Sequence, residues 1–284
     1  MLKQRVITAL VLLAVLLPAL FHGDPRAFMA LMLVFIAAGG WEWGRLNCLG
    51  QGASLALGAI TLAACGASWG LGWHATPQAA LWVPAGVAWV LCGALLLRAG
   101  VPGWPQLAPP VRLVGGLLAL WLTWLAVVQA RVIGINFLLS VLLLVWAADV
   151  FAYFAGRAFG TRLVARKLAP SISPGKSWEG VMGGMLGVVV LAVVWVMADA
   201  HYGATVLSLY SLLAQAGWPV LLLVVLGLAA MSVVGDLVES LIKRSVGAKD
   251  SSGLLPGHGG VLDRVDALLP TLPLALMLYS LLSR

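Results

Sequence analysis

Polar side chains that could do chemistry are concentrated in residues 240–266 of a chain that is otherwise 62% hydrophobic. The bases of this segment are Lys243, Arg244, Lys249, His258 and Arg264, and its carboxylates are Asp250, Asp263 and Asp266. Carboxylates bind divalent cations through oxygen, and cationic side chains form charge-assisted hydrogen bonds to phosphate oxygens. The segment therefore predicts a metal–phosphate site at a membrane surface.

A glycine-rich turn, residues 256–260, interrupts this segment. Its glycines let backbone N–H groups converge on an anion, and His258 could donate a hydrogen bond to a phosphate oxygen. A plain turn before the next helix would explain the same residues. Asp263 and Asp266 follow with Arg264 between them, which favours a metal–phosphate site. Acids also favour a helix N-terminus, so Asp266 alone could be a cap.

The apolar run just upstream carries polar residues on one helical face. On a helix that turns by about 100° per residue, three later side chains lie within about 60° of Asp236. They are Glu239, Ser240 and Lys243. Carboxylates inside a span are costly and usually face the protein interior, where they have a function. The alternative is an ion pair of the Asp236–Lys243 type that only holds helices together.

A third cluster lies near the end of another apolar run. Asp149, Tyr153 and Arg157 share one helical face, and the loop that follows supplies Lys176 just before the next helix. A helix N-terminus attracts anions, so Lys176 could contact a phosphate there. A basic membrane-flanking loop without function is the alternative. The Gly-Lys-Ser here is no P-loop, because Pro170 stands where the first glycine would be.

Membrane helices must position these residues. Only 10% of the chain is charged, against about 25% in soluble domains. Nine apolar runs of about 20 residues could each cross a bilayer: they are 5–22, 27–45, 53–73, 79–98, 112–130, 133–156, 180–199, 218–239 and 266–282. Continuous runs favour helices over a barrel. A shorter piece, 204–214, is expected at the interface. The first run lacks a cleavage site and is expected to be a retained helix.

The distribution of positive charge predicts topology. With the N-terminus inside, all of the 17 Lys and Arg residues fall on one side except Arg26, Arg131 and Arg284. That side is therefore expected to be cytoplasmic, with the C-terminus outside. Most of the net charge of +7 is then explained by the basic residues that set the membrane topology, and nucleic acid is not expected as a partner.

The two halves differ in kind, although we expect one integral membrane domain over 1–284. Residues 1–130 form an N-terminal helical scaffold, and residues 131–284 form the catalytic half, with a polar cleft that faces the cytoplasm. The cluster 41–45, Trp-Glu-Trp-Gly-Arg, is interpreted as an aromatic belt with a snorkelling arginine, distant from the site. Glycines at 180–187 are interpreted as close helix packing.

Taken together, the motifs resemble a known family. Ser240-x-x-Lys243-Arg244, Lys249-Asp250 and Pro256-x-His258-Gly259-Gly260-x-x-Asp263-Arg264-x-Asp266 resemble the signature of bacterial phosphatidate cytidylyltransferases (CDP-diacylglycerol synthases). Residues 149–157, 173–180 and 235–240 match further blocks of that family, and Trp-Glu-Trp-Gly at 41–44 resembles its bacterial members, so the resemblance covers essentially the whole chain. Val150 and Ser177 depart from the common pattern, and neither departure removes a charge.

The resemblance implies an all-helical inner-membrane enzyme that converts CTP and phosphatidic acid to CDP-diacylglycerol and pyrophosphate. It implies Mg²⁺ held by Asp236 and Asp263, and leaves open a second cation, a monovalent one included. It implies Lys176, Lys243, Arg244, Lys249 and Arg264 as phosphate-binding cations, His258, Gly259 and Gly260 as a phosphate cradle, and Asp250 and Asp266 as residues that orient the bases. Ser240, Asp149, Tyr153 and Arg157 are expected to line the substrate site. A homodimer is left open.

Two alternatives remain at this point. One is a CTP-dependent polyprenol or lipid kinase, which would transfer the γ-phosphate instead of the nucleotide. The other is an ion-coupled transporter, but such proteins usually carry repeats and broken helices in both halves, whereas the acids here crowd one half. A CDP-alcohol phosphotransferase is disfavoured because its Asp-Gly-x-x-Ala-Arg pattern is absent.

Overall fold

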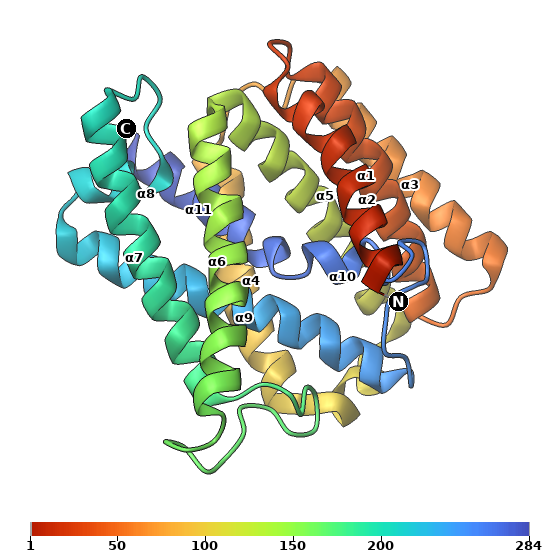
Figure 1. Ribbon diagram of the computed structural model, residues 1–284. Helices are drawn as coiled ribbons and strands as arrows, with labels where there is room; N and C mark the ends of the chain where they lie inside the picture. Colours follow the sequence, from red (N-terminus) through yellow and green to blue (C-terminus); the bar gives the residue numbers. More distant parts are fainter. Residues whose placement is uncertain (1, 284) are drawn as a thin grey trace.

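The computed structural model describes residues 2–283, which form helices joined by loops and contain no strand (Figure 1). Within these residues, eight helices are long and apolar enough to cross a membrane. They are α1 (Leu2–Phe21), α2 (Arg26–Leu46), α3 (Gln51–Gly70), α4 (Ala79–Gly103), α5 (Pro109–Ile133), α6 (Ile135–Phe159), α7 (Trp178–Tyr202) and α9 (Trp218–Ser245). The remaining elements are η1 (Trp104–Gln106), α8 (Leu209–Gln215), α10 (Leu262–Val265) and α11 (Leu268–Leu282). The prediction of an all-helical, multi-pass membrane protein is confirmed.

Eight of the nine predicted spans are therefore confirmed as long apolar helices, and the ninth differs. The run 266–282 yields α11, which has 15 residues and rises by about 22 Å, less than the ~30 Å core of a bilayer. Residues 270–276 of α11 are buried, and Figure 1 shows α10 and α11 passing through the middle of the molecule. The chain thus enters the bundle through α10 before α11 begins.

The short element α8 is built into the bundle. With seven residues it is too short to cross a bilayer. The Tyr210 hydroxyl donates to the Ser140 carbonyl (2.8 Å), and the Leu209 N–H donates to the Ser140 hydroxyl (2.9 Å). Both α8 residues are fully buried. The prediction that 204–214 does not form a span is confirmed, and α8 packs mainly against α9 and α7.

Glycines bring α6 and α7 together, as the sequence predicted. A Cβ placed on Gly184 would lie 2.7 Å from the Ala148 carbonyl oxygen, and one on Gly187 would collide with the Phe151 ring. Since real Cβ atoms avoid such distances, only glycine permits this approach of the two backbones. The close packing fixes α6 against the N-terminal half of α7, the region in which the candidate site lies.

The loops gather at two ends of the bundle. At the first, called the site end, Thr8 of α1 donates to the Pro256 carbonyl (2.9 Å), and Arg244 donates to the Ile172 carbonyl (3.4 Å). Figure 1 shows the loop after α9 beside the N-terminal end of α1. The opposite end is called the far end. There, Arg131 of α5 donates to the carbonyls of Leu20 (2.9 Å) and His22 (2.6 Å). The N-terminus, the loop 160–177 and the loop 246–261 thus share the site end.

Candidate active site

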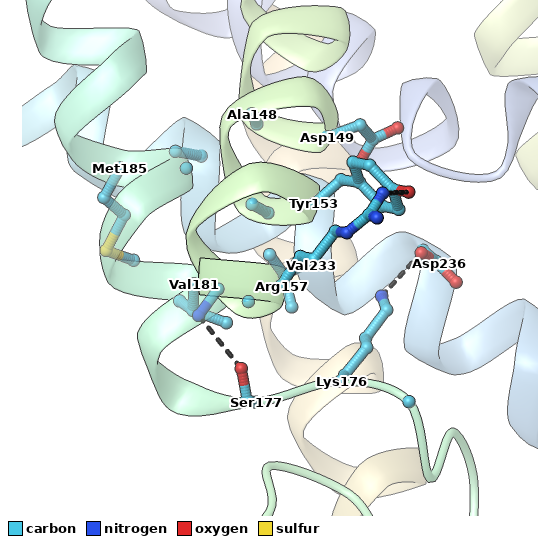
Figure 2. A pocket seen from close by; sticks show the side chains of 16 residues that line it. Ala148, Asp149, Tyr153, Arg157, Lys176, Ser177, Val181, Met185, Val233 and Asp236 are labelled. Atoms are coloured by element: carbon cyan, nitrogen blue, oxygen red, sulfur yellow. Dashed lines mark hydrogen bonds and ion pairs between the residues drawn. The ribbon is translucent and has the colours of Figure 1, made fainter. Parts of the chain in front are cut away.

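A cavity of about 480 Å³ lies between α6, α7 and α9 toward the site end (Figure 2). Its polar residues are Asp149, Tyr153 and Arg157 from α6, Lys176 and Ser177 from the loop before α7, and Asp236 from α9. Its remaining walls are small or apolar: Ala148, Ala152, Gly156, Gly175, Gly180, Val181, Gly184, Met185, Ala229 and Val233. Polar groups on one part and hydrocarbon on the rest suit an amphipathic ligand.

An ion pair joins two elements of this cavity. Lys176 Nζ lies 2.5 Å from Asp236 Oδ2 (Figure 2), and both side chains are half-buried. The Ser240 hydroxyl donates to Asp236 Oδ1 (3.2 Å), as expected for positions i and i+4 of one helix face. Arg157 donates to the Tyr153 hydroxyl (3.2 Å). The alternative of an Asp236–Lys243 pair is wrong, because Asp236 takes its cation from the loop before α7.

Lys243 instead forms a second, nearly buried cluster. Its ammonium lies 2.5 Å from Asp263 Oδ1 and also contacts Glu239, one turn earlier on α9. The side chains of Lys243, Glu239 and Asp263 are 9%, 6% and 5% exposed. One cation therefore faces two acids in a region with little water, and this part of the site has excess negative charge.

Asp263 is held by donors on both carboxylate oxygens. Oδ2 accepts hydrogen bonds from the Ser251 N–H (2.8 Å), the Ser251 hydroxyl (2.8 Å) and the Gly260 N–H (2.7 Å). Burial alone would raise the pKa of Asp263, but Lys243 and the backbone donors outweigh it and lower the pKa below its usual value. Asp263 is thus a fixed, ionised carboxylate at the start of α10.

Asp266 lies in an environment that disfavours its charge. Its pKa is raised first by burial and then by the negative charge of Asp236, and Asp149 adds to the effect, whereas the Ala267 N–H and Lys243 oppose it. Three carboxylates from α6, α9 and the end of α10 therefore act on one another. Each of them was predicted from the sequence as a site residue.

The glycine-rich turn is closed by its own backbone. The Leu255 N–H donates to the Gly259 carbonyl (2.8 Å), and the His258 N–H donates to the Leu255 carbonyl (2.8 Å). Gly259 has φ +83°, and a Cβ there would lie 2.6 Å from Asp263 Oδ2 and 3.5 Å from the Asp250 Cβ. The turn thus packs directly on Asp263 and beside Asp250.

The other predicted cations lie around this turn on the surface. Lys249, Arg264 and Arg244 are exposed. Arg244 donates to the carbonyls of Ala248 (3.0 Å) and Ile172 (3.4 Å), and so joins the loops before α7 and after α9. His258 is half-buried, with its Nδ1 covered and without a hydrogen-bond partner in the described structure. The predicted site residues therefore form two adjoining groups, one at the cavity and one around the turn.

The donor set fits a divalent cation only in part. Among residues 2–283, no group of three His, Cys, Asp or Glu side chains is arranged to hold a metal. Mg²⁺ in phosphate-processing sites needs only one or two carboxylates, because waters and substrate phosphates supply the other ligands. The mutual repulsion seen at Asp266 is what an added cation would relieve. The residues fit a metal that is shared with a phosphorylated substrate.

The sequence analysis missed the role of Glu42. We interpreted residues 41–45 as an aromatic belt distant from the site, and this is wrong for Glu42. Its side chain is fully buried, and its carboxylate accepts hydrogen bonds from Ser252 and from the Val261 N–H. Arg45 is exposed and lies over Trp41, as a snorkelling residue would. A lone acid within an apolar run was the available signal.

A second acid outside the predicted set, Glu179, anchors the loop that carries Lys176. Glu179 Oε1 accepts hydrogen bonds from the N–H groups of Leu163 and Val164, both at 2.8 Å. The Ser177 hydroxyl accepts from the Gly180 N–H (3.1 Å) and caps α7. These contacts hold the loop on both sides of Lys176 and so direct that side chain into the cavity.

The helices and the site define a multi-pass membrane protein with a charged site for a phosphorylated ligand. Comparison with known proteins identifies the class. The model of the cytidylyltransferase family matches residues 3–282. A phosphatidate cytidylyltransferase of Pseudomonas aeruginosa is 39% identical over 282 residues, which cover 96% of this chain and 95% of that protein.

A phosphatidate cytidylyltransferase of Haemophilus influenzae is 37% identical over 295 residues, covering 96% of each chain. One from Bacillus subtilis is 38% identical over 152 residues, which cover 53% of this chain and 49% of that protein. The chain therefore belongs to the cytidylyltransferase family, and it is a nucleotidyltransferase. These relatives support neither the lipid kinase nor the transporter.

Proposed function

We propose that this enzyme transfers the cytidylyl group of CTP to phosphatidic acid, forming CDP-diacylglycerol and pyrophosphate for phospholipid synthesis. The relatives of nearly equal length support this activity. The structural observation that carries the proposal is the cavity, where the Lys176–Asp236 ion pair meets walls of Ala, Gly, Val and Met from membrane helices. A lipid phosphate can lie at the charged groups while the hydrocarbon stays against apolar ones.

The reaction needs charge neutralisation more than it needs a base. An oxygen of the lipid phosphate attacks the α-phosphorus of CTP, and the bond from that phosphorus to the β-phosphate oxygen breaks. Pyrophosphate leaves with the electron pair. Because the attacking oxygen is already anionic, bringing two anions together is the main barrier. Lys176 and Arg157 supply positive charge at the cavity, and Arg244, Lys249 and Arg264 supply it around the turn.

Asp236 and Asp263 are the residues that would hold Mg²⁺. Asp236 Oδ1 and Oδ2 have one partner each, Ser240 and Lys176, and Asp263 Oδ1 has only Lys243. Each of these oxygens therefore keeps a lone pair for a cation. When bound, the ion neutralises phosphate charge and polarises the attacked phosphorus. Asp149 adds negative charge to this region of the site.

The turn 256–260 and its neighbours would receive the phosphates of the nucleotide. His258 offers a ring nitrogen, Nδ1, that has no hydrogen-bond partner in the described structure, while Gly259 and Gly260 let the backbone of the turn pack closely on Asp263 and Glu42. Asp250 and Asp266 would orient the nearby bases. The packing of this turn on Asp263 supports a triphosphate that bridges the turn and the metal ligands.

Lipid would enter sideways from the bilayer at the site end. Tyr153 and Phe154 are 59% and 61% exposed on the outer face of α6, and Tyr153 also lines the cavity. The protein would lie in the cell inner membrane with its site end on the cytoplasmic side, because the N-terminus and both basic loops are at that end. Cysteines placed at 170 and 283 would then react with impermeant reagents from opposite sides. Labelling of both from one side would contradict this topology.

The activity is tested in proteoliposomes that contain the purified enzyme and phosphatidic acid. Added CTP and Mg²⁺ should yield CDP-diacylglycerol and pyrophosphate in equal amounts, and omitting either substrate should abolish both products. Lys176→Ala should lose most of the activity, whereas Arg26→Ala, an exposed far-end cation, should lose little. Formation of CDP with a newly phosphorylated lipid would contradict the proposal.

A further inference from the structure

Glu42 of α2 joins the N-terminal half of the chain to the site. Its carboxylate accepts four hydrogen bonds, all from residues more than 200 positions away along the chain: Ser252 Oγ to Oε1 (2.6 Å), Val261 N to Oε1 (2.9 Å), Leu262 N to Oε2 (2.8 Å) and Ser251 Oγ to Oε2 (3.2 Å). The Glu42 side chain has no exposed surface. A buried carboxylate is costly unless its oxygens are satisfied, so this arrangement specifies an acid at position 42.

The same backbone segment is held from its other side by Asp263. The Gly260 N–H donates to Asp263 (2.7 Å), and the next N–H, that of Val261, donates to Glu42. Ser251 lies between the two acids, with its hydroxyl 2.8 Å from Asp263 Oδ2 and 3.2 Å from Glu42 Oε2. The two carboxylates therefore clamp one turn of the chain, and moving one displaces the donors of the other.

The fit around the clamp leaves no spare room. A Cβ on Gly260 would collide with both the Ser251 hydroxyl and Glu42 Oε1. Position 260 therefore excludes any side chain, and the turn cannot move away from α2 without breaking the hydrogen bonds to Glu42. The position of Asp263, at the start of α10, thus depends on α2.

We infer that Glu42 is a positioning residue for the proposed cytidylyl transfer: through Ser251, Ser252 and the N–H groups of residues 261 and 262, it fixes Asp263 and the glycine-rich turn for the metal and the nucleotide phosphates. The inference rests on the proposed function. Glu42 itself does not line the cavity. Its contribution is to hold other groups in place, as residues behind metal ligands do.

The test compares Glu42→Gln with Asp199→Asn in the full-length enzyme. Asp199 is a matched control because its carboxylate also accepts four hydrogen bonds, from Asn136, from Ser211 and twice from Ser208. It lies at the far end. Each substitution replaces a carboxylate by a neutral amide, whose NH₂ group then faces N–H and O–H groups that are themselves donors. Both variants should therefore lose thermal stability.

Only Glu42→Gln should change the site. Loss of a residue that positions metal ligands costs about 10- to 100-fold in metal affinity or activity, so we expect the Mg²⁺ concentration for half-maximal rate to rise at least about 10-fold. Asp199→Asn should leave this concentration unchanged. Hydrogen–deuterium exchange without metal or nucleotide should be faster at 251–262 in Glu42→Gln than in wild type, and unchanged there in Asp199→Asn.

A purely structural role for Glu42 predicts a different result. If the folded Glu42→Gln enzyme keeps the wild-type Mg²⁺ requirement and the wild-type exchange at 251–262, the inference is wrong. If Glu42→Gln does not fold, Ser252→Ala removes one of the four donors and should raise the Mg²⁺ requirement by less than Glu42→Gln is expected to; an unchanged requirement there also overturns the inference. A wild-type enzyme that makes no CDP-lipid would refute the proposed function, while the exchange experiment would still decide whether Glu42 fixes the turn.

Discussion

Gly235→Ala adds one methyl group next to Asp236, the proposed metal ligand, at the contact between α9 and the chain leading into α11. The new Cβ would collide with the Asp266 carbonyl oxygen and would lie 2.9 Å from Cγ and Cδ of Pro270. Ordinary carbon contacts need about 3.5 Å or more. The segment 266–270 must therefore move away from α9 by roughly 0.6–1 Å, and Asp266 moves with it.

The expected consequence is a large loss of turnover with a smaller loss of stability. A misplacement of about 1 Å in an active site can cost about 10²-fold in rate, and overpacking costs about 1–3 kcal/mol of folding free energy. The assay measures kcat in proteoliposomes together with thermal unfolding. Substrate affinities should change less than kcat, because the cations on the loops that are proposed to bind phosphate are not displaced.

Gly227→Ala is the matched control on the same helix. A Cβ at position 227 meets nothing within 4 Å, and alanine is a better helix former than glycine by about 1 kcal/mol. This variant should keep full activity. If Gly235→Ala also keeps near-wild-type kcat, the close approach of α9 to residues 266–270 is not required for catalysis, and the reasoning fails.

Three further predictions concern the carboxylates, the turn and the metal. Asp236→Asn and Asp263→Asn should each lower turnover by about 10²-fold or more, most strongly at limiting Mg²⁺, whereas the exposed Asp24→Asn should not; normal rates at low Mg²⁺ would remove the first two as ligands. Gly259→Ala should reduce activity and stability together, because its φ of +83° and its contact with Asp263 exclude a side chain. A Cβ at position 253 would meet nothing within 4 Å, so Gly253→Ala should be neutral by both measures. Removing divalent metal with a chelator should abolish product formation, and adding Mg²⁺ back should restore it; full activity in the chelator would contradict a metal-dependent reaction.

The sequence predicted the membrane helices well, because a long apolar run has one stable form in a bilayer. α11 was predicted two residues too early and as a full span. A separate short helix, α10, ends at Val265 just before this run, and α11 begins only at Leu268. A hydrophobic run by itself does not tell whether its residues face lipid or other helices, and residues 270–276 are buried in the bundle.

The sequence named the charged side chains that gather at the candidate site, but it did not predict which of them pair with each other. Helical periodicity placed Asp236 and Lys243 on one face, yet Asp236 pairs with Lys176 from another element and Lys243 pairs with Asp263. Periodicity describes only one helix at a time, so partners that come from other elements are invisible to it. Glu42 was missed for the same reason, since its hydrogen-bond partners lie up to 220 positions away.

The central claim is that the nucleotide, and not the γ-phosphate, reaches the lipid. Parallel reactions with CTP labelled at the α-phosphate and at the γ-phosphate, in proteoliposomes that contain phosphatidic acid, test it directly. The α-label should enter the lipid fraction while the γ-label leaves as pyrophosphate, and both events should depend on Mg²⁺. Transfer of the γ-label to lipid, with the α-label remaining in soluble CDP, would contradict it.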